Sequence, residues 1–343
     1  MHNLAVQPAP VYEDGEQPVI FTATGSEYFR IWIVNLLLTI VTFGIYSAWA
    51  KVRRTQYFYA STELAGSSFE YHGNPKAILK GRILAAVLFG AYNVATKASV
   101  TAGVIAFLVF AALMPLIMWK SMQFKLHNTS YRGIRFGFNG SALEAYAYFL
   151  LLPMLFGTGL LAPLAHHRIK RFQVTESRYG SRQFGFDAPV SGFYAIWIGM
   201  ALIFAAGLLA LSWLGGKVAG EGQAGMAVVL TTAAGLLFWG LLPVAFCALQ
   251  NLIWSHISIG EHQMRCNMKT RTLLWIYATN LLGMLLTLGL YTPFAKVRAM
   301  KYRLESMSLV VNGSLDGFVA AEAEHQNAAG EGMADVFDMD LSL

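Results

Sequence analysis

The chain has 343 residues, of which 56% are apolar and only 13% are charged, and its formal net charge is +6. These proportions exclude an ordinary soluble globular domain, in which about a quarter of the residues are charged. Two cysteines, Cys247 and Cys266, supply neither a disulfide framework nor the spacing of a metal site. We therefore expect a mainly α-helical, polytopic membrane protein.

Composition divides the chain into three parts. Residues 1–28 form an acidic, proline-bearing leader without the features of a cleaved signal peptide. Its segment VIFTATGS, residues 19–26, predicts one strand. Residues 29–318 make up the membrane domain. Residues 319–343 carry acidic side chains and no Lys or Arg, which predicts a disordered cytosolic tail.

The membrane domain contains apolar stretches of the length that crosses a bilayer, roughly 20 residues. We place about seven of them, at residues 31–50, 83–95, 98–119, 142–165, 190–214, 224–255 and 272–295. Turn and basic residues separate these stretches, so the sequence predicts repeated apolar helices with short connectors.

A short sequence motif occurs twice in the chain in similar form, as YSAWAKVRRTQYF at residues 46–58 and as YTPFAKVRAMKYR at residues 291–303. Aligning the connectors on the small or proline residue before each basic cluster extends the pattern to five modules, with anchors at Ala48, Pro115, Pro163, Pro243 and Pro293. Alternating aromatic residues follow, such as Phe136 and Phe138, and this alternation is typical of a strand. We expect five hairpins that assemble into one small sheet or barrel-like cap, because unpaired strand edges need partners.

Charge assigns a side to these connectors. Lys and Arg gather in all five, and basic residues accumulate in short cytoplasmic connectors. If all five face the cytoplasm, the stretches 31–50, 142–165 and 272–295 must enter and leave the membrane on one side. The hairpins 83–119 and 190–255 then supply four crossings. Ordinary spans for all seven stretches remain the alternative.

The chain resembles the YjgN-like family of bacterial inner-membrane proteins, over roughly residues 19–318. The matching text is FTATGSEYF, TFGIYSAWAKVRRTQYF with GSSFEYHG, and TLGLYTPFAKVRAMKYR. The fourth module and the HHRIKR segment depart from the pattern. The resemblance implies a multi-pass protein of the bacterial inner membrane, but the family supplies no substrate, cofactor or catalytic residue.

Candidate site residues are few. Basic residues near the module starts predict contact with an anionic solute or lipid headgroup, because Lys and Arg side chains bind phosphate and carboxylate; these are Lys51, Arg53, Arg168, Lys296 and Arg298. Topogenic snorkelling at the membrane edge is the competing interpretation. Asn35 and Asn280 occupy corresponding apolar stretches and need hydrogen-bond partners there.

The sequence shows no catalytic or nucleotide-binding motif, so we expect no enzyme, no cofactor and no metal site. The expected partners are the lipid bilayer and anionic lipid headgroups. Nucleic acid is not expected, because the basic residues are spread over connectors that abut the membrane. The sequence favours transport, channel activity or lipid handling. The alternative is a membrane scaffold whose basic cytoplasmic cap recruits a protein partner, unidentified by the sequence, or anionic lipid.

Overall fold

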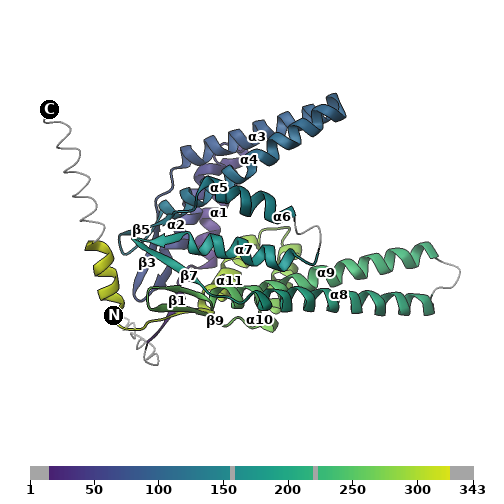
Figure 1. Cartoon of the computed structure of the whole chain (residues 1–343). Coiled ribbons are helices and arrows are strands. Elements are labelled where there is room, and N and C mark those ends of the chain that lie inside the picture. Colours follow the sequence, from purple (N-terminus) through teal and green to yellow (C-terminus); the bar gives the residue numbers. More distant parts are fainter. Residues whose placement is uncertain (1–14, 155–158, 219–222, 325–343) are drawn as a thin grey trace.

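The computed structural model describes residues 15–154, 159–218 and 223–324 (Figure 1). Its centre is a closed barrel of ten short strands in the order β1-β10-β9-β8-β7-β6-β5-β4-β3-β2. The strands are β1 (Glu16–Phe21), β2 (Thr62–Leu64), β3 (Ser67–Tyr71), β4 (Thr129–Tyr131), β5 (Ile134–Phe138), β6 (Ser177–Tyr179), β7 (Arg182–Phe186), β8 (Ile257–Ile259), β9 (His262–Cys266) and β10 (Met307–Val310). All neighbouring strands pair antiparallel. The hairpins expected from the alternating aromatics therefore close into a barrel.

Two-residue turns join the strands of four hairpins. Ala65 and Gly66, with φ of 45° and 74°, connect β2 to β3, and Arg132 and Gly133, with φ of 49° and 80°, connect β4 to β5. Two successive left-handed residues make a type I′ turn, whose twist matches that of the flanking strands. The tight turns fix the register, so that Leu64 pairs with Ser67.

The fifth strand pair is formed by the first and the last strand of the described chain. Strand β1 pairs with β10 on one side, Glu16 opposite Val310, and with β2 on the other, Val19 opposite Leu64. The leader strand thus takes the place of the second strand of the fifth hairpin, and the barrel has no open edge.

Long helices extend away from the barrel as two antiparallel hairpins (Figure 1). They are α3 (Pro75–Ala98) with α4 (Val100–His127), and α8 (Val190–Val218) with α9 (Gln223–Trp254). Four helices in the described ranges are long and apolar enough to cross a membrane, and they belong to these two hairpins. The seven apolar stretches are therefore not seven spanning helices. The four helices agree with the interpretation in which the hairpins 83–119 and 190–255 supply four crossings, and residues 83–95 form the middle of α3.

The other three stretches fold as bent helix pairs. Helix α1 (Gly25–Val41) turns into α2 (Ser47–Ala60), and α10 (Thr270–Leu286) turns into α11 (Thr292–Glu305). The third pair runs from α5 (Ala142–Tyr146), a π-helical turn η1 (Ala147–Leu151) and α6 (Leu152–Met154) to α7 (Ala162–Thr175). A 17-residue helix such as α1 rises only about 25 Å, short of a bilayer core. Hydropathy alone identifies these stretches as candidate spans, because it measures the apolar character of a segment and not the bend within it.

The bends of the first and last pairs are alike. Phe43 and Gly44 have φ of 49° and 89°, and Leu288 and Gly289 have φ of 50° and 90°. The apolar side chains at both tips are almost fully exposed, Phe43 at 97% and Leu288 at 96%. Each pair begins and ends at barrel strands, since α1 follows β1 and α2 precedes β2. Both helices of a pair therefore lie on the same side of the barrel, with an apolar tip pointing away from it.

Each of the five anchor positions lies in a helix that leads into the first strand of a hairpin. These helices are α2, α4, α7, α9 and α11. Where they meet the barrel, buried aromatic side chains fill the junction; Phe58 of α2, for example, packs against Phe21 of β1 with ring centroids 6.0 Å apart.

The structure differs from the expected disordered tail between residues 319 and 324. Residues 315–324 form a helix against the barrel, and its Glu322 carboxylate is 1% exposed. Ser181 and Arg182 donate hydrogen bonds to this carboxylate. Composition did not reveal this because one favourable contact outweighs the polar character of the segment. The rest of the predicted tail, residues 325–343, lies outside the described residues.

Candidate functional site

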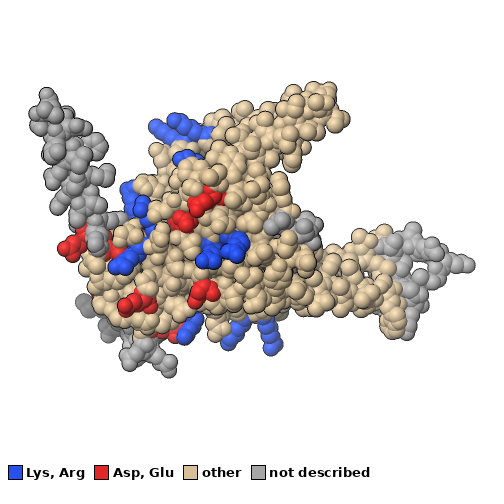
Figure 2. Space-filling view, viewed as in Figure 1, with Lys and Arg blue, Asp and Glu red and all other residues tan. Residues whose placement is uncertain are grey.

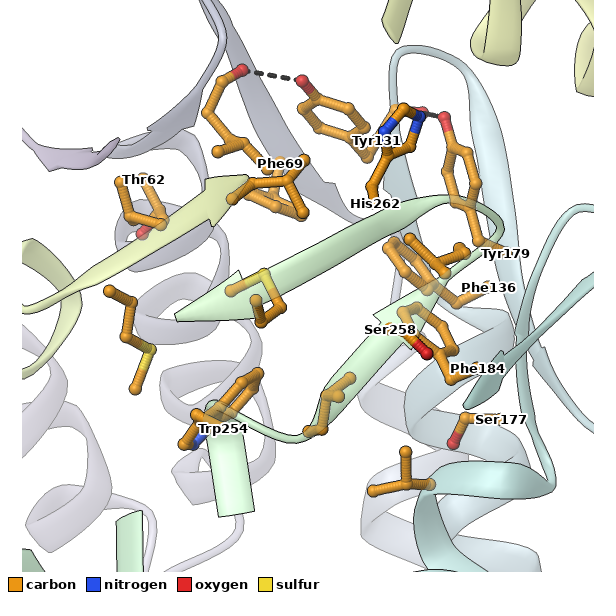
Figure 3. A pocket seen from close by; sticks show the side chains of 18 of the residues that line it. Thr62, Phe69, Tyr131, Phe136, Ser177, Tyr179, Phe184, Trp254, Ser258 and His262 are labelled. Atoms are coloured by element: carbon orange, nitrogen blue, oxygen red, sulfur yellow. Dashed lines mark hydrogen bonds between the residues drawn. The ribbon is translucent and has the colours of Figure 1, made fainter. Parts of the chain in front are cut away.

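The inside of the barrel is an apolar cavity of about 370 Å³, which we call the lumen (Figure 3). The second strand of every hairpin contributes one matching wall residue, namely Val19, Phe69, Phe136, Phe184 and Met264. Because side chains alternate along a strand, the residue two positions later turns the same way and packs against the helices; Phe138 is an example. The alternating aromatics of the sequence therefore build the wall of the lumen and its junction with the helices.

The two ends of the lumen are covered by different elements. At the membrane-helix end, one apolar residue from each of four helices lines it, namely Leu126, Val174, Trp254 and Leu304. At the opposite mouth the helix 315–324 contributes Leu315, Phe318 and Val319. Phe318 lies against Tyr179, with ring centroids 6.3 Å apart and the rings stacked. Parts of the chain therefore line the lumen at both ends, and it remains partly open.

Few polar groups face the lumen, and the tyrosine hydroxyls among them bond to the barrel backbone. Tyr131 Oη donates to the Leu64 carbonyl at 2.6 Å, and Tyr179 Oη donates to the Tyr131 carbonyl at 3.1 Å. His262 is 3% exposed, and its Nδ1 has no hydrogen-bond partner among the described residues. Burial lowers the pKa of His262, although the nearby Glu261 carboxylate opposes the shift. A buried polar atom without a partner costs about 1–3 kcal/mol. His262 Nδ1 is such an atom, but it is buried in the wall and is not exposed to the lumen, whose surface is almost entirely apolar.

A second feature is a group of basic side chains from five helices, which we call the basic cluster. It consists of Lys51 and Arg54 of α2, Arg82 of α3, Lys125 of α4, Lys170 of α7 and Lys296 of α11. Burial lowers the pKa of Lys51, and the like charges of Arg82, Arg54 and Lys125 lower it further. Burial and the Lys125 charge lower the pKa of Lys170. Burial and the Arg54 charge do the same for Lys296. These like charges lie close enough to destabilise one another.

No carboxylate within the described ranges forms an ion pair with the basic cluster. Its described hydrogen bonds go to neutral groups: Arg82 Nη1 donates to Ser47 Oγ, and Lys170 Nζ donates to Gln173 Oε1 at 3.1 Å. Arg54, Arg82, Lys170 and Lys296 are half-buried, whereas Lys51 and Lys125 are exposed. Cations of one sign repel each other, and an anion with several oxygens relieves this by accepting from more than one. The arrangement is therefore suited to a phosphate or carboxylate group.

The structure separates the sequence-predicted basic residues. Lys51 and Lys296 belong to the basic cluster. Arg53 and Arg168 are exposed. Arg298 is half-buried, and its Nη1 donates to Thr279 Oγ1 at 2.8 Å. Lys51 and Lys296 lie two residues before Arg53 and Arg298 in the same helices, and the charge of Arg54 lowers the pKa of both lysines. A shared anion site for the three arginines stays a prediction.

Both predicted intramembrane asparagines are buried within the bent pairs. Asn280 Nδ2 donates to the Ala295 carbonyl at 3.0 Å and so connects α10 to α11. The Oδ1 atoms of Asn35 and Asn280 have no partner in the described part of the chain. Neither residue lines the lumen.

Sequence reasoning missed Arg54, Arg82, Lys125 and Lys170 as members of the basic cluster. Lys170 lies seven residues after its anchor and Lys51 three after its own, a separation of one helical turn that places them on matching helix faces. Combining this spacing over the aligned modules was the available signal. The surface shows where the charges lie. Lys and Arg gather over the barrel and the bases of the helices, while the described outer parts of the two long hairpins show no charge on this face (Figure 2).

The chain is similar to known bacterial proteins. The family model described as "Bacterial protein of unknown function (DUF898)" matches residues 16–336. The chain belongs to this family. It is 31% identical over 138 residues to "Inner membrane protein YjgN" of Salmonella typhimurium and 33% identical over 147 residues to the protein of the same name from Escherichia coli K12.

These alignments cover 40% and 41% of this chain but only 35% and 36% of the two relatives. No solved structure matches the chain. The relatives are named as inner membrane proteins and four helices here are suited to crossing, so the chain is a multi-pass inner membrane protein of the DUF898 family.

Proposed function

We propose that this DUF898 protein handles lipid and that its basic cluster binds an anionic headgroup. The observation that carries the proposal is a set of six Lys and Arg side chains on five helices, linked pairwise by charge repulsion that lowers the pKa of Lys51, Lys170 and Lys296, with no carboxylate paired to them in the described residues. A lipid phosphate supplies the missing counter-charge, and an inner membrane presents such phosphates beside the bases of the helices.

The orientation that fits this role has the barrel in the cytoplasm. The connectors rich in Lys and Arg all belong to the barrel side of the helices, which agrees with the basic bias of cytoplasmic connectors. The helices α3, α4, α8 and α9 then make four crossings, and the bent pairs dip into the cytoplasmic leaflet with Phe43 and Leu288 at their tips. In this proposal the five helix–hairpin modules are one repeated unit that holds the barrel against the membrane.

Lipid handling is favoured over solute transport by the position of the polar groups. A transport path between the repeats would be expected to expose Asn35 and Asn280 to water. Both are instead buried within helix pairs, at 6% and 4% exposure. The scaffold alternative, in which the basic cap recruits a protein, draws on the same charges, and the lipid-binding test below separates the two.

The test is lipid retention by purified protein measured by native mass spectrometry in neutral detergent. Dioleoyl phosphatidylglycerol is titrated against dioleoyl phosphatidylcholine. The cluster variant carries Lys51→Gln, Lys170→Gln and Lys296→Gln. The control variant loses the same charge at three exposed lysines outside the cluster, Lys76→Gln, Lys80→Gln and Lys269→Gln.

We expect the wild type and the control to retain phosphatidylglycerol and the cluster variant to bind it at least about tenfold more weakly, since each lysine near a lipid surface contributes about 1 kcal/mol. Equal loss in both variants would show that only net charge matters and would reject the site. Inorganic phosphate is tested in parallel; if it displaces the lipid at millimolar concentration, the site takes a soluble anion instead of a headgroup.

A further inference from the structure

The lumen is a built site that the headgroup proposal does not use. Its wall comes from strands that span the whole chain, from Val19 to Leu309, and encloses about 370 Å³. A dry protein cavity of about 150 Å³ already holds a benzene molecule, and small-molecule sites begin at about 300 Å³. The lumen therefore has the size of a ligand site and exceeds an ordinary packing defect.

The lining excludes ions and favours a chain-like apolar molecule. Among the described residues, no Lys, Arg, Asp or Glu side chain lines the lumen, so a charged group would lose its hydration there without compensation. At roughly 30 Å³ per water-sized unit, the volume corresponds to about a dozen such units. A single aliphatic chain of about that many heavy atoms matches both the volume and the chemistry.

The lumen offers a ligand almost no polar surface. The hydroxyls of Tyr131 and Tyr179 donate to the barrel backbone, and His262 Nδ1, which lacks a partner among the described residues, is buried in the wall. Figure 3 shows the His262 ring on the same side of the lumen as these two tyrosines, with Trp254 at the far side. A ligand of the lumen is therefore held by apolar contacts along its chain.

We infer that the lumen binds a neutral single-chain apolar molecule, a long-chain alcohol or an uncharged acyl compound. Its aliphatic chain fills the lumen between Phe318 and Trp254. The molecule enters by displacement of the helix 315–324, which covers the mouth with Phe318. No residue of the basic cluster lines the lumen, although Gln173, which accepts a hydrogen bond from Lys170 Nζ, does. An uncharged probe therefore tests the lumen separately from the headgroup site.

The cover is attached by polar contacts at its edges. Asp316 Oδ1 accepts a hydrogen bond from Arg132 Nη1 at 2.6 Å, and Glu322 Oε1 accepts one from Arg182 Nε at 3.0 Å. Between them Phe318 lies against the His262 ring, with centroids 5.1 Å apart and the planes at 86°. Polar anchors around one apolar side chain form a cover that can detach as a unit without unfolding the barrel.

The experiment uses a photoreactive dodecanol that carries a diazirine on its chain. The full-length protein in lipid nanodiscs is irradiated with this probe, with and without excess 1-dodecanol, and labelled peptides are identified by mass spectrometry. We expect saturable labelling of barrel residues 257–266 that 1-dodecanol abolishes. Labelling of α3, α4, α8 and α9 from the bilayer serves as the internal reference and is not expected to saturate.

Two variants make the result decisive. Met264→Trp fills the lumen and is expected to remove the competed labelling, whereas Met154→Trp, at an exposed position outside the barrel, leaves it unchanged. Phe136→Trp narrows the lumen from another strand, and about tenfold more 1-dodecanol should then be needed for competition. If Met264→Trp fails to fold in a thermal melt, Phe136→Trp decides alone. Uncompeted barrel labelling, or unchanged competition in a folded Met264→Trp or Phe136→Trp protein, would overturn the inference.

Discussion

Replacing Glu322 by alanine removes the buried carboxylate that holds the helix 315–324 on the barrel. This carboxylate accepts hydrogen bonds from the Ser181 amide at 2.8 Å, the Ser181 hydroxyl at 2.7 Å and Arg182 Nε at 3.0 Å. Breaking a fully buried ion pair costs about 3–5 kcal/mol. Arg182 is 56% exposed, however, and water solvates it once it is freed. We therefore expect the docking free energy to fall by about 2–3 kcal/mol.

Hydrogen exchange of the backbone amides in residues 315–324, measured by mass spectrometry in nanodiscs, reports this change. A loss of 2–3 kcal/mol corresponds to about 30- to 150-fold faster exchange, since 1.4 kcal/mol is tenfold. Glu324→Ala is the matched control, because Glu324 lies on the same helix, is exposed and has no described partner; its exchange should change by less than about twofold. Exchange in the Glu322→Ala protein within twofold of wild type would refute the assigned role of the carboxylate.

Three further predictions follow from particular residues. Burial raises the pKa of Glu322, but the hydrogen bonds from Ser181 and Arg182 outweigh it and bring the pKa below its ordinary value of 4.5. Docking of the helix 315–324 is therefore complete above about pH 5 and is lost as the pH falls through the lowered pKa. Exchange rates of the helix that rise between pH 7 and 5, after correction for the intrinsic pH dependence of exchange, would contradict this. Gly44→Ala should destabilise the protein by about 1–2 kcal/mol in detergent melts, because its φ of +89° is strained for alanine. The added Cβ meets no atom within 4 Å, so backbone strain is the cause and not a clash. Gly81→Ala in α3 should instead be neutral or stabilising, and equal effects of the two substitutions would refute the strain argument. Burial raises the pKa of Cys266 to about 11, with a smaller contribution from Cys247, so iodoacetamide at pH 8 should leave Cys266 unmodified in the folded protein; prompt alkylation detected by mass spectrometry would show that the thiol is accessible.

The barrel was predictable in outline because strand alternation is a local signal. Phe136 and Phe138 lie two residues apart, and the same pattern in the other modules indicated hairpins that need partners. The strand predicted in the leader is the element that closes the barrel, β1 beside β10, although it spans Glu16–Phe21 and not residues 19–26. The volume of the lumen and its cover were not predictable, because they depend on the positions of side chains from ten strands and several helices.

The membrane helices show the limit of hydropathy. An apolar segment that contains two left-handed residues such as Phe43 and Gly44 has the same hydropathy as a continuous spanning helix, yet the chain reverses there. The basic cluster was only partly predictable for a related reason: Lys125 and Lys170 lie 45 residues apart in sequence and become neighbours only when α4 and α7 pack. Glu322 was hidden by its acidic surroundings, since composition averages over a segment and cannot single out one buried carboxylate.

The central claim is that all barrel strands share the cytoplasmic side and that only the two long helix hairpins cross the membrane. Cysteines introduced singly by Lys97→Cys, Lys217→Cys and Arg178→Cys, in a background with Cys247 and Cys266 replaced, are treated with an impermeant thiol reagent on intact cells. Positions 97 and 217 belong to the ends of α3 and α8 that are distant in sequence from the barrel strands, and position 178 is on β6. The account predicts labelling at 97 and 217 and none at 178. Labelling of position 178 from outside would contradict it and restore seven ordinary spans.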